Sequence, residues 1–217
     1  PSVTAARPAR VARWPTSVTQ DVESYLVLLD TVVADARDRF GAGGVPLYAS
    51  GLSNGVPMAY FYACGRANAV DAILAVAGTQ NGGSAAVCQP SRAVGLVLIH
   101  GTADPVVPYT GLGLLRAIQD NYDDFKVLNQ CGGIDGFALL QNPDGDVEID
   151  YTQPCSRSPG NRRVVFATLL GNGHNWPGDD VGPLGGIELP IGPFGPALNS
   201  LDATIQGYDL MRYASGN

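Results

Sequence analysis

The sequence predicts an α/β fold in which helices flank a mostly parallel sheet of about four core strands, with a small hairpin added. Two observations lead to this prediction. Continuous apolar runs bounded by glycine, typical of strands buried on both faces, occur at 72–78, 94–101 and 163–171. Segments with apolar residues at three- and four-residue steps, typical of amphipathic helices, lie before and between these runs.

The N-terminal part opens with an arm, residues 1–16, that has no clear periodicity. Helical periodicity then covers residues 22–40 and is ended by a glycine-rich stretch. The run VPLYAS at 45–50 predicts a short strand, and a second helix follows over about 54–64. Pro57 is tolerable there only because it falls in the first helical turn.

The C-terminal part continues the alternation. A helix is predicted over 113–128, and a hairpin that turns at NPDG over 136–151. A loop rich in glycine and proline spans roughly 177–198. The chain closes with a helix whose cap is Asn199 or Ser200.

Length and composition limit the class of protein. The chain has 217 residues, enough for one domain over 1–217, with 45% hydrophobic and 15% charged residues. Its net charge of −7 argues against nucleic acid as a partner. No apolar run approaches the ~20 residues that a membrane span needs. The sequence begins at Pro1 rather than Met, which fits a mature form, an engineered product or a fragment.

The chain has four cysteines and only two histidines. No two cysteines form a C-x-x-C pair, so we do not expect a zinc site. An even number of cysteines favours two disulfides in an exported protein, and the alternative is four buried thiols. The cysteines are Cys64, Cys88, Cys131 and Cys155.

The stretch Gly51-Leu52-Ser53-Asn54-Gly55 reads G-x-S-x-G between the predicted strand and helix. In a nucleophile elbow the chain turns so sharply that the residues two before and two after the serine must be small. The turn exposes the hydroxyl of Ser53 and points the N–H of Asn54 toward a developing oxyanion.

A serine nucleophile needs an acid and a histidine, in the chain order Ser, Asp, His. Asp104 lies in HGTADPVVPY and His174 in GNGHNWPG, each just after a predicted strand. Asp104 would orient the imidazole, and His174 would take the proton from Ser53. Each residue also has a purely structural interpretation. The alternative for Ser53 is an ordinary glycine-rich turn, that for Asp104 is a turn former, and that for His174 is a structural loop histidine. His100 is the competing base, but it ends its strand before Asp104.

Two aromatic residues, Tyr109 and Trp176, lie near the triad residues in sequence. They are candidates for an aromatic substrate pocket, and packing in the core or at its rim is an equal alternative.

Three motifs together, GLSNG with the following MAY, HGTADPVVPY and GHNWPG, resemble the secreted polyhydroxybutyrate depolymerase and feruloyl esterase group of α/β-hydrolases. The resemblance runs from about Val22 to the last helix. It implies a serine carboxylesterase without metal or cofactor, and esters of polymers, including aromatic polyesters, or feruloyl or acetyl esters as substrates. It also implies two disulfides, Cys64–Cys88 and Cys131–Cys155.

The chain departs from this family in two places. Val56 and Pro57 follow the elbow glycine, where the family has glycine and methionine. The family's early strands and oxyanion loop are missing, because only 16 residues precede the first helix. We therefore expect a reduced α/β-hydrolase fold whose first strand is an exposed edge. Such an edge favours a homodimer, or cover by residues 1–16.

These observations predict a secreted serine esterase that forms an acyl-enzyme at Ser53. The alternative is a truncated, weakly active or non-catalytic derivative that binds or scaffolds, since the loss of one oxyanion donor costs ~100- to 1000-fold in turnover.

Overall fold

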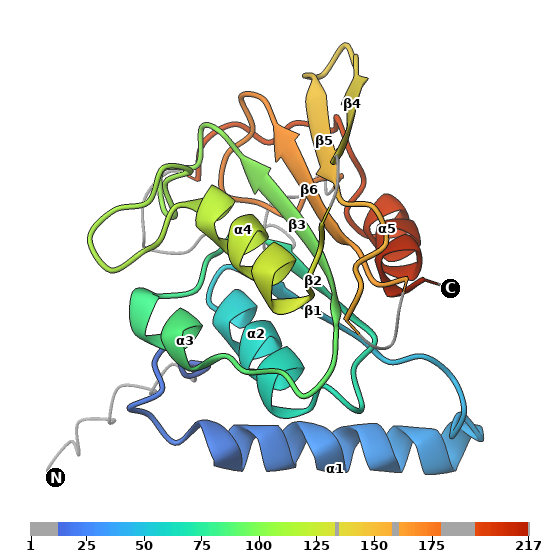
Figure 1. Ribbon diagram of the computed structural model, residues 1–217. Helices are drawn as coiled ribbons and strands as arrows, with labels where there is room; N and C mark the ends of the chain where they lie inside the picture. The colour runs from blue at the N-terminus through green and yellow to red at the C-terminus, as the bar shows by residue number, and fades with distance from the viewer. Residues whose placement is uncertain (1–12, 133–134, 158–160, 179–193, 217) are drawn as a thin grey trace, which may run out of the picture.

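The computed structural model describes residues 13–132, 135–157, 161–178 and 194–216 (Figure 1). Its centre is a mixed sheet of six strands in the order β1-β2-β3-β6-β5-β4. The strands are β1 (Tyr48–Leu52), β2 (Ala72–Val76), β3 (Gly95–Gly101), β4 (Gly136–Leu140), β5 (Val147–Tyr151) and β6 (Val164–Leu169). The first three strands and β6 run parallel, whereas β4 and β5 form an antiparallel hairpin. The α/β class is confirmed, but the sheet is larger than predicted because the hairpin pairs with β6.

Five helices surround the sheet in the part of the chain that is described: α1 (Val22–Phe40), α2 (Gly55–Gly65), α3 (Gly82–Val87), α4 (Ile118–Leu128) and α5 (Ile205–Ser215). Helices α2 and α4 pack on one face and α5 on the other, while α1 packs mainly on α2 (Figure 1). Alternate residues of each inner strand therefore enter two separate cores. Within the described ranges, no helix is long and apolar enough to cross a membrane.

Local side chains set the ends of the first helix. The carboxylate of Asp21 accepts the backbone N–H of Ser24 at 3.2 Å, so α1 begins at Val22. Gly41 ends α1 in the left-handed conformation, with φ of 62°. Both ends agree with the sequence prediction.

Three predicted boundaries are wrong. Residues 113–117 are not helical, because Gly113 has a φ of 62° and the chain makes a tight turn before α4. The last helix begins at Ile205 and not at Asn199 or Ser200, because the carboxylate of Asp202 accepts the N–H groups of Thr204 and Ile205. Strand β1 covers 48–52 rather than 45–50, and thus runs directly into the serine turn. The short helix α3 was not predicted, and most of the loop predicted at 177–198 lies outside the described residues.

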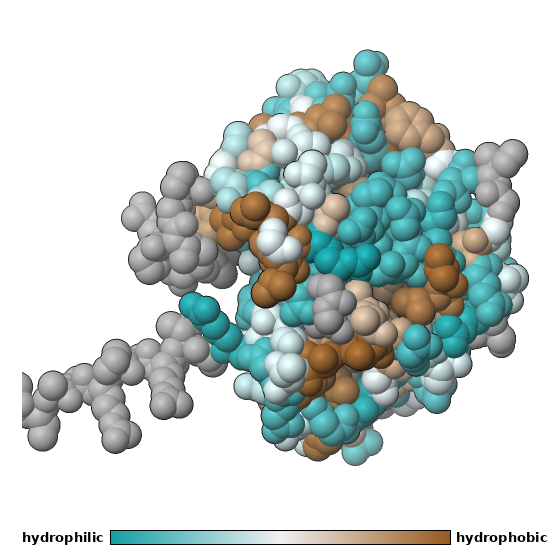
Figure 2. Space-filling view, turned by 60° about the vertical axis from the view of Figure 1, so that its left-hand side comes forward, coloured by the Kyte–Doolittle hydropathy of each residue, from teal (hydrophilic) through white to brown (hydrophobic). Residues whose placement is uncertain are grey.

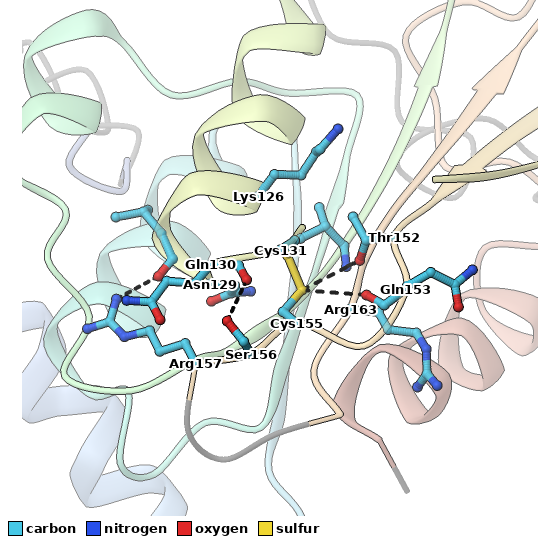
Figure 3. The surroundings of a disulfide bond; sticks show 12 residues. Lys126, Asn129, Gln130, Cys131, Thr152, Gln153, Cys155, Ser156, Arg157 and Arg163 are labelled. Carbon is cyan, nitrogen blue, oxygen red and sulfur yellow. Dashed lines mark hydrogen bonds between the residues drawn. A yellow bond between two sulfur atoms is a disulfide. The ribbon is translucent and has the colours of Figure 1, made fainter. Parts of the chain in front are cut away.

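The structure contains two disulfides with the pairing that the resemblance implies, Cys64–Cys88 and Cys131–Cys155. Figure 3 shows the second bond, which ties the end of α4 to the segment after β5. Two hydrogen bonds also join these two segments. The hydroxyl of Ser156 donates to the carbonyl of Gln130 at 2.9 Å, and Arg157 donates to the carbonyl of Leu128 at 2.7 Å.

Strand β1 is an edge of the sheet. The backbone groups of Leu47 and Ser53 point toward β2, since Leu47 accepts from Asp71 and Ser53 donates to Val76. Because these directions alternate along a strand, the groups of Tyr48, Ser50 and Leu52 point outward, and no strand pairs with them in the described ranges.

The flank of this edge is only partly covered. Val45 is 54% exposed, and Leu47 and Tyr48 are half-buried. From the arm, Trp14 lines a pocket beside β1 together with Leu47 and Tyr48. Residues 1–12, the rest of the arm, lie outside the described residues.

Candidate active site

Ser53 lies in a sharp turn between β1 and α2. It has a φ of 52°, a left-handed conformation that is unusual for a residue other than glycine. Its N–H donates to the carbonyl of Val76 on the neighbouring strand at 3.0 Å, and its own carbonyl accepts the N–H of Val56 at 3.0 Å. The serine is thus held in a strained backbone conformation by β2 on one side and α2 on the other.

Two glycines make room for this turn. A Cβ atom at Gly51 would lie 2.4 Å from the carbonyl oxygen of Gly55, and one at Gly78 would lie 2.7 Å from the carbonyl oxygen of Ser53. At Gly55, by contrast, an added Cβ would meet nothing within 4 Å outside its own helix. The expectation that both glycines of the motif must be small is therefore correct for Gly51 and wrong for Gly55.

The structure brings Ser53, His174 and Asp104 together, although they lie far apart in sequence. The Nε2 atom of His174 lies 2.8 Å from the Oγ of Ser53, and its Nδ1 lies 2.8 Å from Oδ2 of Asp104. The three residues follow β1, β3 and β6, whose carboxyl ends meet at one edge of the sheet.

Asp104 is buried and accepts several hydrogen bonds. Its Oδ1 accepts the N–H groups of Val106 and Val107, each at 2.8 Å, and its Oδ2 accepts from His174. Burial opposes its ionisation, but the hydrogen bonds from His174 and the backbone outweigh it and hold the pKa of Asp104 below its usual value. The carboxylate is therefore charged at neutral pH and fixes Nδ1 of His174 as the protonated nitrogen.

His174 is 2% exposed, and its loop is anchored by the segment after residue 193. Its N–H donates to the carbonyl of Phe194 at 2.6 Å, and its ring stacks on that of Phe194 with centroids 5.9 Å apart. Gly173 approaches this segment so closely that an added Cβ would lie 2.3 Å from the Phe194 carbonyl oxygen. The imidazole has little freedom to leave its position between Asp104 and Ser53.

His100 lies outside the relay. Its Nε2 donates to the carbonyl of Val107 at 2.9 Å and lies 3.4 Å from Oδ2 of Asp104, while its buried Nδ1 has no partner in the described part of the chain. Burial lowers the pKa of His100 and keeps it neutral. It thus supports the loop that carries Asp104, and it makes no contact with Ser53 that would let it act as the base.

Asn54, which follows the serine, contributes both a backbone N–H and a side-chain contact with the arm. As the cap residue of α2, it has a backbone N–H without an intrahelical acceptor, which suits the predicted oxyanion role. Its side chain accepts the N–H of Trp14 at 3.0 Å and donates to the carbonyl of Trp14 at 3.4 Å. Sequence reasoning missed this contact, because a side-chain bond to the backbone over 40 residues leaves no local pattern.

The two aromatic candidates do not share a pocket. Tyr109 stacks on Phe166 and hydrogen-bonds with Thr168, on the α2–α4 face of the sheet. Trp176 is partly buried and packs against the core on the α5 side, where its Nε1 donates to the hydroxyl of Thr204 at 2.9 Å. These contacts agree with the packing alternative for both residues.

No protein-family model matches the chain, and no curated protein matches its sequence. In the described part of the chain, no three His, Cys, Asp or Glu side chains gather as a metal site requires.

Proposed function

We propose that this protein is a serine carboxylic-ester hydrolase of the α/β-hydrolase type, related to the polyhydroxybutyrate depolymerase and feruloyl esterase group. The observation that carries the proposal is the continuous relay from Ser53 through His174 to Asp104, with both hydrogen bonds at 2.8 Å. The left-handed backbone of Ser53 adds to it, because an elbow of this kind exposes a nucleophile.

The relay supports a two-step reaction. His174 takes the proton of Ser53 at Nε2 while Oγ attacks the ester carbonyl carbon, and the resulting oxyanion accepts the N–H of Asn54. The protonated imidazole then gives its proton to the leaving alkoxide, which departs as an alcohol and leaves an acyl-serine. In the second step His174 removes a proton from water, the hydroxide attacks the acyl carbon, and Ser53 recovers its proton as the acid leaves.

Two further features agree with the proposal. The parallel strands β1, β2, β3 and β6, with the triad at their carboxyl ends, have the arrangement expected of a reduced α/β-hydrolase sheet. The two disulfides fit an oxidising compartment, and we propose that the protein is secreted.

Covalent labelling by a fluorophosphonate tests the proposal, because the reagent reacts with an activated serine and not with an ordinary one. We expect the wild-type protein to be labelled at Ser53 and to hydrolyse p-nitrophenyl acetate. Ser53→Ala should lose both properties and keep its free energy of unfolding, and His174→Ala should be about as inactive. A folded wild-type protein that is neither labelled nor active would contradict the proposal and favour the non-catalytic alternative.

A further inference from the structure

The side chain of Asn54 stands at the start of α2 but does not cap that helix. An asparagine in this position usually accepts an N–H group of the first helical turn and stabilises the helix in this way. In this structure Asn54 has helical backbone angles, with φ of −59° and ψ of −19°, and its side chain makes no capping hydrogen bond to α2. The side-chain amide is used instead for a contact outside the helix.

The partner of this amide is the backbone of Trp14 in the arm. Oδ1 of Asn54 accepts the N–H of Trp14 at 3.0 Å, and Nδ2 of Asn54 donates to the carbonyl of Trp14 at 3.4 Å. The amide thus pairs with both backbone groups of one residue, which lies 40 positions earlier in the chain. Because hydrogen bonds are directional, two of them restrain the orientation of the amide as well as its distance from the arm.

The arm is fixed to other elements besides the elbow. The ring of Trp14 packs edge to face on that of Tyr25 in α1, with centroids 5.7 Å apart. The carbonyl of Thr16 accepts from the side chain of Asn81, which follows β2, and the N–H of Thr16 donates to the side chain of Gln20 at 2.7 Å. In Figure 1 this segment runs beneath α3 toward the start of α1, and Figure 2 brings that side forward, where hydrophilic and hydrophobic groups are mixed. The arm therefore offers Asn54 a partner that is itself held in place.

The backbone N–H of Asn54 is the group that would face the oxyanion. It belongs to the peptide unit between Ser53 and Asn54, whose direction is set by the ψ of Ser53 and the φ of Asn54. On one side this peptide is held by its oxygen, because the carbonyl of Ser53 accepts the N–H of Val56 at 3.0 Å. On the other side the bonds to Trp14 hold the side chain of Asn54 and so restrict its φ. A donor that is held in its direction stabilises a developing charge better than one that must first reorient.

We propose, resting on the proposed function, that the side chain of Asn54 and the backbone of Trp14 form a clamp that positions the N–H of Asn54 for the oxyanion. Both are positioning residues in this respect, because the clamp acts through the N–H and not directly on the substrate. The interaction that it strengthens is made in the transition state. Loss of the clamp should therefore lower kcat and leave KM unchanged.

The test compares two single variants and their double variant with the wild type in p-nitrophenyl acetate hydrolysis. Asn54→Ala removes the side chain of the clamp and keeps the backbone N–H, whereas Trp14→Pro removes the N–H that Asn54 accepts. We expect kcat to fall about tenfold in each, less than the ~100- to 1000-fold that the loss of an oxyanion donor costs, because the N–H of Asn54 remains. The double variant should be no slower than either single variant, since all three lack the same interaction.

Asn129 provides the matched control, because its amide makes the same pair of bonds away from the elbow. Oδ1 of Asn129 accepts the N–H of Val94 at 3.2 Å, and its Nδ2 donates to the carbonyl of Val94 at 2.7 Å. Val94 precedes β3, whereas Asp104 follows it, so this pair lies at the opposite edge of the sheet. Asn129→Ala should lose stability and keep its kcat. If it does not fold, Asn142→Ala takes its place, since it loses a side-chain bond to the carbonyl of Ser200.

A second measurement separates the clamp from the relay. The hydrogen bonds of the relay do not include Asn54, so the pH at which kcat/KM is half-maximal should be the same in Asn54→Ala as in the wild type. A wild-type kcat in Asn54→Ala, or a further loss in the double variant, would overturn the clamp and leave the esterase proposal intact. A shifted pH midpoint, or an equal loss of kcat in the control variant, would also overturn it, because the effect would then come from the relay or from stability. A wild-type protein that hydrolyses no ester would reject the proposed function and the clamp with it.

Discussion

Gly51 provides the sharpest test of the elbow, because the same motif contains its control. In Gly51→Ala the new Cβ would lie 2.4 Å from the carbonyl oxygen of Gly55, 2.5 Å from its carbonyl carbon and 2.8 Å from the nitrogen of Val56. Real Cβ atoms essentially never approach closer than 3.0 Å, so the start of α2 must move by at least about 0.6 Å. All three atoms belong to the backbone, and no side-chain rotation can relieve the contact.

This displacement should lower both the free energy of unfolding and the turnover of Gly51→Ala. Forcing an extra methyl group into a packed site costs typically 1–3 kcal/mol, so the free energy of unfolding should fall by about 2–3 kcal/mol. The movement also shifts the N–H of Asn54 and the hydroxyl of Ser53 relative to His174. A misplacement of about 1 Å can cost ~100-fold in rate, and we expect a fall of that order in kcat.

Gly55→Ala is the matched control. Its Cβ meets nothing within 4 Å outside its own helix, and alanine forms helices better than glycine, so the variant should be as stable as the wild type or more stable by about 0.5–1 kcal/mol. Urea unfolding followed by fluorescence, together with p-nitrophenyl acetate hydrolysis, measures both effects. Equal stability and activity of the two variants would refute the argument that the close approach at Gly51 shapes the elbow.

Three other properties can be tested. Burial lowers the pKa of His100, so the unfolded chain binds a proton more readily than the folded protein. The free energy of unfolding should therefore fall as the pH drops below about 6.5. Urea unfolding between pH 7.5 and 5.5 should show a smaller loss of stability in His100→Gln than in the wild type. Each disulfide links cysteines 24 residues apart, so Cys131→Ala/Cys155→Ala should lose about 3–4 kcal/mol of stability, and titration of the denatured, unreduced wild type should find no free thiol. No strand of the described residues pairs with the outer edge of β1, so we expect dimers in sedimentation experiments. A protein that is monomeric both with and without residues 1–16 would exclude association through this edge and cover by the arm.

The elements that carry the triad could be predicted because their signals are local. The apolar runs before Asp104 and His174 identify buried strands, and the spacing of G-x-S-x-G identifies a turn between a strand and a helix. The carboxyl ends of parallel strands lie at one edge of a sheet, so three residues that each follow such a strand were expected at the same edge.

The parts that could not be predicted depend on contacts between distant segments. The apolar spacing of 113–128 favours a helix, but the paired backbone bonds of Leu112 and Leu115 hold the first residues in a turn. Glycine is required at Gly51 and not at Gly55 because backbone atoms lie close to the Cα of Gly51 only. The G-x-S-x-G motif is symmetric and does not indicate this difference.

Residues 14–16 of the arm make the clearest example of such a contact. Nothing in the periodicity of residues 1–16 relates them to the elbow, yet two asparagine side chains bind this segment beside Ser53. The bonds of Trp14 join the arm to Asn54, the residue that would stabilise the oxyanion. A change that breaks the bonds between Trp14 and Asn54 should consequently affect the rate at the serine.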